Sequence, residues 1–212
     1  MATAMRPDTK TDLTELRPEC FKASRAPQVI RLPEASYLAL EGAGAPEQAL
    51  PEAIGALYSI AYGLKFRLKS QGCDFKVCPV EAQWWMLDPR GKEAPDIWDS
   101  APEHWHWRLL IMVPDYVIAE DVEAVKQSAR LSNAAVVGVH LIRLEGEPAA
   151  QVMHVGPYEA EKPTIDLLRA FIAREGLEPN GRHTEVYLGD PRRTRPEKLR
   201  TILRQPVKVA SS

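Results

Sequence analysis

Apolar residues recur every three or four positions in one long stretch of the first half of the chain. This spacing is typical of one face of an α-helix, and it is seen at Leu50, Ile54, Leu57, Ala61, Leu64 and Leu68. Pro51 suits the first turn of such a helix and Gly72 suits its exit. The pattern therefore predicts a helix that opens at Leu50-Pro51 and ends before Gly72.

Extended, apolar-rich runs surround this helix. Residues 29–40, interrupted by Pro33, precede it, and residues 75–85 and 105–113 follow it. Each run has the length and the flanking turn residues of a β-strand. The first half of the chain is thus predicted to be strand, helix, strand, strand.

The second half repeats this order over a shorter length. Residues 149–155 predict a strand, and a helix opens at Pro163 and closes at Gly176. Residues 183–188 and 199–207 predict two further strands. A chance likeness of the two patterns is the alternative to a true duplication.

Two units of one kind predict an α+β fold with pseudo-twofold symmetry, antiparallel sheets and a ligand cleft at the junction of the units. We expect an N-terminal extension over residues 1–26 and a single domain over residues 27–208. Within that domain the first module covers about residues 28–115, a linking helix about 119–131 and the second module about 135–208. By this repeat, Glu81 and Glu185 would occupy corresponding places.

Composition narrows the class of protein. The chain has 212 residues, of which 45% are hydrophobic and 26% charged, as in ordinary globular proteins. A net charge of −2 argues against direct nucleic-acid binding or an anionic membrane surface, and no apolar run has the length of a membrane span. Three cysteines without a CxxC pair indicate free thiols in a reducing cytoplasm. No spacing fits a zinc site, and no metal or cofactor is expected.

One carboxylate stands out in the strand over residues 183–188. Side chains alternate along a strand, so Glu185 and Tyr187 share one face. A carboxylate beside a phenol on a half-buried strand is either costly or functional. The alternative is an edge strand with Glu185 in water.

Aromatic residues accompany the carboxylates. By strand parity Trp85 shares a face with Glu81, and Trp105 shares one with Trp107. On the long helix, Tyr58 and Tyr62 are four residues apart and lie beside the leucine stripe. These rings either fill a core or form the walls of a site for flat or cationic molecules.

The sequence resembles the GyrI-like small-molecule-binding domains over about residues 12–207. The resemblance rests on LYSIAYGLKF (57–66), PVEAQWW (79–85), WHW (105–107) with IMVP (111–114), QVMHVGPY (151–158), HTEVYL (183–188), DPRR (190–193) and PEKLRTILR (196–204). It is specific to a stand-alone subfamily that includes hydrolases of cyclopropane-bearing, DNA-alkylating toxins. It departs from the family at Ala82-Gln83, where Gly-Leu is usual, and at Thr184, where a second His is usual.

The resemblance implies that Glu185 matches the carboxylate at the pocket floor and that the tryptophans and tyrosines match an aromatic cage. The leading hypothesis is a hydrolase that opens such toxins, with Glu185 as general base and Tyr187 as proton donor. Other candidate donors and substrate-binding residues are Tyr58, Tyr62, Tyr158, Glu81, Trp85, Trp105 and Trp107.

Two other hypotheses stay open. The chain is either a non-catalytic binder of cationic aromatic drugs, with Glu185 as counter-charge, or an effector-sensing part of a regulator. Residues 1–26 are too few for a helix-turn-helix, and the basic run over residues 192–204 is typical of a solvated turn. The predicted partner is therefore an aromatic small molecule, and the sequence does not indicate an oligomeric state.

Overall fold

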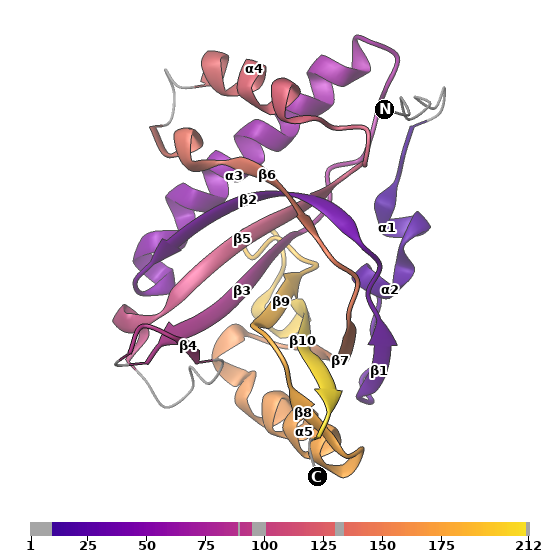
Figure 1. Cartoon of the computed structure of the whole chain (residues 1–212), viewed down its shortest axis with the longest axis vertical. Coiled ribbons are helices and arrows are strands. Elements are labelled where there is room, and N and C mark those ends of the chain that lie inside the picture. The colour runs from indigo at the N-terminus through magenta and orange to yellow at the C-terminus, as the bar shows by residue number, and fades with distance from the viewer. Residues whose placement is uncertain (1–9, 89, 95–100, 130–133, 211–212) are drawn as a thin grey trace.

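The computed structural model describes residues 10–88, 90–94, 101–129 and 134–210 (Figure 1). Its centre is an antiparallel sheet in the order β1-β7-β10-β9-β3-β5-β2-β6, with β4 paired to β3 and β8 to β10. The strands are β1 (Gln28–Arg31), β2 (Ala35–Ala43), β3 (Val80–Leu87), β4 (Glu93–Ala94), β5 (His106–Val113), β6 (His140–Leu144), β7 (Pro148–Val155), β8 (Leu177–Pro179), β9 (His183–Tyr187) and β10 (Arg200–Val209).

Two long helices lie at opposite ends of the molecule. Figure 1 shows α3 (Pro46–Lys69) beside α4 (Ala119–Ala129) at one end and α5 (Lys162–Arg174) at the other. Helix α3 begins one turn earlier than expected, because Pro46 occupies its first turn and leaves Pro51 inside the helix. Gly72 and Gly176 follow the two helices with φ of 84° and 67°, which glycine adopts without strain.

The order of the strands agrees with two strand–helix–strand–strand units. β2, α3, β3 and β5 form the first unit, and β7, α5, β9 and β10 form the second. The units contribute β2-β5-β3 and β7-β10-β9 to the sheet, and β3 pairs with β9 between them. The predicted α+β class with antiparallel strands is confirmed, and the strands form one large sheet. The superposition of the two halves stays a prediction.

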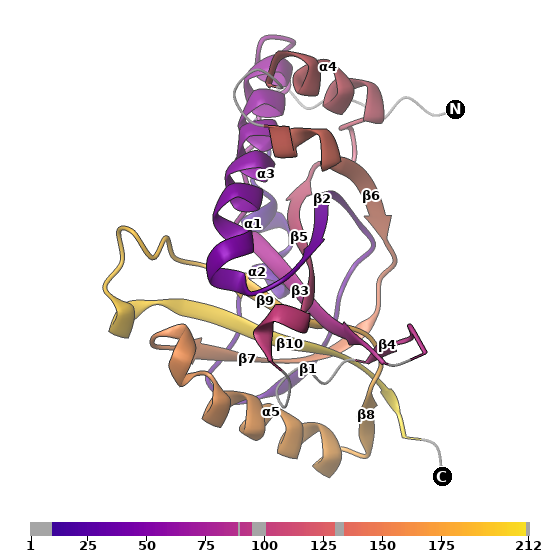
Figure 2. The same cartoon turned by 90° about the vertical axis from the view of Figure 1, so that its left-hand side faces the viewer.

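The strand register assigns side chains to the two faces of the sheet. Glu185 lies opposite Ala82 of β3 and Leu203 of β10, and opposed residues point to the same side. Leu203 packs with apolar residues of α5, so this is the face that α5 covers (Figure 2). We call it the helix face, and it carries Ala82, Trp84, Trp107, His183, Glu185, Tyr187 and Leu203.

The other face of the sheet carries Glu81, Gln83, Trp85, Thr184 and Arg204; we call it the opposite face. The N-terminal segment packs there through the short helices α1 (Leu13–Leu16) and α2 (Pro18–Phe21). Arg204 Nη2 donates to the carbonyl oxygen of Cys20 at 2.7 Å, and Gln151 Nε2 donates to that of Lys22 at 3.0 Å. Part of the expected N-terminal extension is therefore bound to the sheet.

Some expected boundaries differ. The run over residues 29–40 is divided near Pro33 into β1 and β2, and β1 pairs with β7 of the second unit. β3 begins at Val80, because Phe75 makes only an isolated bridge with Thr11. The linking helix is described as far as Ala129, and residues 130–131 of the expected range lie outside the described residues. Among the described helices, none is long and apolar enough to cross a membrane.

Candidate functional site

Glu185 and Tyr187 form the centre of the candidate site. The hydroxyl of Tyr187 donates a hydrogen bond to Glu185 Oε2 at 2.5 Å. Both side chains project from β9 onto the helix face, as strand parity requires. Only 7% of Glu185 is exposed, so the carboxylate lies inside the protein and not at a wet sheet edge.

Burial changes the acidity of this pair. It raises the pKa of Glu185 to about 7, while the Tyr187 hydroxyl and the Trp84 indole oppose the rise. It also raises the pKa of Tyr187 well above its usual value, and the charge and hydrogen bond of Glu185 add to that effect. Near neutral pH Glu185 is therefore poised between its charged and neutral forms, while Tyr187 keeps its proton.

A second buried carboxyl, Glu161, lies close enough to interact with Glu185. Glu161 is the N-cap of α5 and only 4% exposed. Burial raises its pKa to about 9, the charge of Glu185 adds to the rise, and Thr201 opposes it. Thr201 opposes the rise without forming a well-aligned hydrogen bond. Within the described residues, neither Glu161 Oε1 nor the Thr201 hydroxyl has a partner of good geometry.

The sequence did not single out Glu161. An acidic residue at the start of a helix usually faces water, where it interacts with the helix dipole. The turn over residues 156–161 instead directs Glu161 inward, and nothing in its local pattern distinguishes it from the exposed Glu159. The position of Glu161 depends on how α5 docks on the sheet, which is a tertiary property.

Two further side chains border the pair. The rings of Tyr158 and Tyr187 meet edge to face, with 5.5 Å between centroids and 75° between planes. His183 Nε2 lies 3.7 Å from Glu185 Oε1. Burial lowers the pKa of His183 to about 4, so the imidazole is neutral near pH 7 and does not neutralise Glu185.

The tryptophans divide between the two faces. Trp84 lies on the helix face beside Glu185, although its indole N–H makes no well-formed hydrogen bond to a described residue. Trp105 meets Trp84 edge to face at 5.7 Å and 72°. Trp107 is only 5% exposed and lies so close to Gly42 that a Cβ there would be 2.2 Å from its ring. Gly42 therefore makes room for the Trp107 ring.

Trp85 and Glu81 do not join this site. Trp85 lies on the opposite face, where Arg182 sits 3.4 Å above its ring and His106 stacks on it at 5.7 Å. Glu81 lies on that face too, with Oε2 3.6 Å from Arg204 Nη1. The expected correspondence of Glu81 and Glu185 is wrong, because the register pairs Glu185 with Ala82 and turns Glu81 to the other side.

The two tyrosines of α3 lie farther out. Tyr58 is half-buried and hydrogen-bonds to the backbone of Val80, and burial raises its pKa. Tyr62 is 47% exposed and its ring lies between those of Tyr58 and Phe66, at 6.2 and 6.4 Å. Tyr58 thus lies at the start of β3, and among the contacts of the described residues none joins these rings to Glu185.

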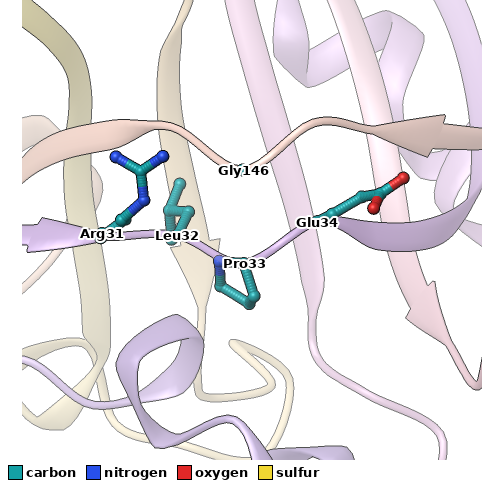
Figure 3. Close-up of a pocket in the computed structure, with 5 residues that line it drawn as sticks. All are labelled: Arg31, Leu32, Pro33, Glu34 and Gly146. Atoms are coloured by element: carbon teal, nitrogen blue, oxygen red, sulfur yellow. The ribbon is translucent and has the colours of Figure 1, made fainter.

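The site is closed in this structure. Trp84, Glu161 and Glu185 are almost fully buried. Two hollows in the described structure are lined by other residues, one at the linkers between strands (Figure 3) and one on the opposite face. The expected ligand cleft at the junction of the two units stays a prediction. Among the described residues, no group of three or more His, Cys, Asp or Glu side chains is placed to hold a metal ion.

Comparison with known families gives a match in the second half of the chain. Residues 115–208 match the family model of the GyrI-like small molecule binding domain. This range contains Glu161, Glu185 and Tyr187. No protein among those with curated descriptions matches the sequence.

Solved structures resemble the whole chain. A hydrolase from Listeria innocua is 32% identical with a TM-score of 0.80, over 94% of this chain and 100% of that one. An uncharacterized conserved protein from the same organism is 33% identical, with the same TM-score and the same coverage. The C-terminal domain of EcmrR is 11% identical with a TM-score of 0.57, over 87% of this chain and 98% of that one, which is a likeness of fold alone.

Proposed function

The chain belongs to the GyrI-like small-molecule-binding family, and from this we propose that it is a hydrolase that opens the cyclopropane ring of DNA-alkylating cyclopropanoid toxins. A Listeria innocua protein described as a hydrolase is 32% identical to it over 94% of its length. That likeness supports hydrolysis in general. The cyclopropanoid substrate rests on the sequence motifs and on the chemistry of the site.

The observation that carries the proposal is the pair of buried carboxyls. Glu185 has a pKa of about 7 and Glu161 one of about 9, both raised by burial. Between these values one carboxyl is charged while the other holds a proton. Two titratable groups whose pKa values are pushed apart are suited to act as base and acid in one reaction.

Glu185 is the proposed general base. Its carboxylate takes a proton from water while the water oxygen bonds to a cyclopropane carbon and the strained carbon–carbon bond breaks. The electron pair of that bond moves into the adjoining dienone, which becomes a phenolate. General-base assistance typically contributes about 10²–10⁴-fold to the rate.

Glu161 is the proposed acid, and Tyr187 has a different part from the one expected. The Tyr187 hydroxyl donates its hydrogen bond to Glu185 in this structure, so the Tyr187 proton is not free to be given to the substrate. Glu161 Oε1 has no partner among the described residues, and its proton is the one available for the developing phenolate. In this proposal Tyr187 orients Glu185, and Glu161 donates the proton that converts the phenolate product to a phenol.

Aromatic rings are the proposed walls of the slot. Trp84 and Trp105 on one side and Tyr158 on the other flank the carboxyls. A flat conjugated ligand stacks well on such rings. Because the site is closed, we expect the half-buried Tyr158 and Trp105 to move aside when a ligand enters.

A second candidate function is binding without turnover. A buried negative charge among aromatic rings also suits a cationic aromatic drug, which Glu185 would neutralise. The GyrI-like family match is to a binding domain, which supports binding without turnover as much as it supports hydrolysis.

Product counting separates the two functions. Protein is mixed with a fiftyfold excess of a spirocyclopropyl dienone, and the ring-opened alcohol is quantified over time. A hydrolase gives many equivalents of alcohol per protein. If the protein forms no more than one equivalent of alcohol beyond the amount formed without protein, hydrolysis is refuted and the binding function remains.

A further inference from the structure

The turn that leads from β7 into α5 carries two side chains of the candidate site. Tyr158 lies in it with its ring against that of Tyr187, and Glu161 lies at its end, close enough to interact with Glu185. The turn contains a short 3₁₀ helix (Tyr158–Ala160), whose backbone hydrogen bonds run within the turn and into the start of α5. Such local bonds shape the turn but do not fix its place on the sheet.

The apolar packing of α5 begins only after this turn. Ile165, Leu168 and Ile172 are the buried residues of α5, and they pack on apolar side chains of β7 and β10. Apolar contacts are non-directional, so they hold the helix on the sheet without setting the direction of a carboxyl at its N-cap. Among the described residues Glu161 Oε1 has no partner of its own. A directional contact elsewhere must therefore hold the turn.

His154 supplies that contact. It lies near the end of β7 and is only 6% exposed. Its Nε2 lies 3.2 Å from the carbonyl oxygen of Pro157, and its Nδ1 lies 2.9 Å from Thr164 Oγ1. Because a carbonyl oxygen only accepts, Nε2 donates to Pro157, and Nδ1 of the neutral ring accepts from the Thr164 hydroxyl. One ring thus joins the start of the turn to the first turn of α5, with Glu161 between the two joined points.

The strand register places His154 in one row with the site. His154 lies opposite Thr201 of β10, and Thr201 lies opposite Tyr187 of β9. Opposed residues point to the same side, so all three lie on the helix face. The two hydrogen bonds of the His154 ring go to the turn and to α5, so His154 acts on Glu161 and Glu185 through the position of the turn.

We propose that His154 is a positioning residue for the carboxyl pair, which holds the turn through Pro157 and Thr164 in the arrangement that directs Glu161 inward, toward Glu185. This rests on the proposed function in one respect, namely that Glu161 gives a proton to the product. A displacement of about 1 Å in a reacting group can cost about 10²-fold in rate. Loss of either hydrogen bond of His154 should therefore slow the reaction in a protein that still folds.

Variants of Thr164 test this link with the His154 ring in place. Thr164→Val keeps the shape of a half-buried side chain and removes its hydroxyl, whereas Thr164→Ser keeps the hydroxyl. With a spirocyclopropyl dienone we expect Thr164→Val to lower kcat by about tenfold to 10²-fold with little change in KM, and Thr164→Ser to retain most of kcat. His154→Leu should lose as much as Thr164→Val, and the exposed His140→Leu is its control. Thr164→Val keeps the test valid if His154→Leu does not fold.

A second readout does not need turnover. Carboxyl ¹³C resonances of labelled glutamates report the protonation of Glu161, whose signal is the one missing in Glu161→Gln. Burial and the charges of Glu185 and Glu159 raise its pKa to about 9, and Thr201 opposes them. Once the turn is loose, water reaches the carboxyl, so in Thr164→Val this pKa should fall toward the ordinary value of 4.5. A merely structural role would lower the melting temperature and leave the pKa and kcat unchanged.

The two readouts separate this inference from the proposed function. If wild type does not turn over the dienone, hydrolysis fails, and the titration of Glu161 still decides whether His154 positions it. A wild-type titration of Glu161 in folded Thr164→Val and His154→Leu would overturn the positioning role, whatever their rates. A pKa near 4.5 for Glu161 in wild type would overturn it too, because the carboxyl would then face water.

Discussion

At the scale of single residues, the protonation of the buried carboxyl pair affects both the stability of the folded protein and the proposed reaction. Glu161 and Glu185 are both buried, and both have pKa values raised mainly by burial. Their titrations are linked through their mutual charge, so the observed pKa values belong to the pair. A group whose pKa is raised on folding stabilises the folded protein below its unfolded pKa, and this contribution is lost as the pH rises through the folded value.

This linkage predicts how Glu161→Gln changes the free energy of unfolding. Gln resembles protonated Glu and pays no cost for holding a proton or a buried charge. We expect wild type and variant to be about equally stable near pH 4, and the variant to become increasingly more stable as the pH rises toward 9. Urea unfolding at a series of pH values measures this difference, with Glu52→Gln at an exposed position of α3 as control. A constant difference at all pH values would show that Glu161 does not titrate inside the protein.

The same pair predicts the pH dependence of kcat/KM. Activity requires Glu185 without its proton and Glu161 with its proton. The rate should therefore rise with pH through about 7, fall through about 9, and be greatest between them. Initial rates with a spirocyclopropyl dienone give this profile, corrected for the hydrolysis of substrate alone. A profile that stays flat from pH 5 to pH 10 would rule out both assignments.

At the scale of elements, strand parity could be predicted from the sequence and strand register could not. Parity within β9 correctly places Glu185 and Tyr187 on one face, where they form a hydrogen bond. Parity within β3 likewise separates Trp84 from Trp85. The relation between Glu81 and Glu185 depends on how β3 and β9 pair, and a shift of one residue reverses the face of every side chain. Neither strand contains a local signal that fixes this pairing.

The close contact between β2 and β5 gives a test of packing on the helix face. Gly42→Ala would place a Cβ 2.2 Å from the Trp107 ring, so the ring or the strand must move. We expect a loss of about 1–3 kcal/mol in the free energy of unfolding, as for other overpacked sites. Gly55→Ala in α3, where a Cβ meets nothing within 4 Å, should instead stabilise by about 0.5–1 kcal/mol. Equal melting temperatures for the two variants would show that Trp107 yields easily.

Removing the Trp107 side chain is expected to lower the stability of the fold and not chiefly the affinity for a ligand. It is almost fully buried and packs over Gly42. Trp107→Ala should therefore cost about 3–5 kcal/mol of stability. Calorimetric unfolding measures this loss, and a small loss together with a specific decrease in ligand affinity would return Trp107 to the binding site.

At the scale of the whole molecule, the candidate site is assembled from both halves of the chain. The first half supplies Trp84 and Trp105, and the second supplies Glu161, Glu185 and Tyr187. The order of elements in each half was predictable because helix and strand periodicity is local. The docking of α5 and of the N-terminal segment on the two faces of the sheet was not, because it depends on contacts between residues far apart in sequence.

The most direct test of the central claim is product formation by Glu185→Gln in ¹⁸O-labelled water. Wild type should convert many equivalents of a spirocyclopropyl dienone to the ring-opened alcohol carrying ¹⁸O. The variant keeps the shape of Glu185 but not its basicity, so it should lose turnover by about 10²-fold or more while binding the neutral aromatic substrate normally. Glu52→Gln, at an exposed position of α3, should match wild type. Turnover by Glu185→Gln at the wild-type rate, with ¹⁸O in its product, would contradict the account.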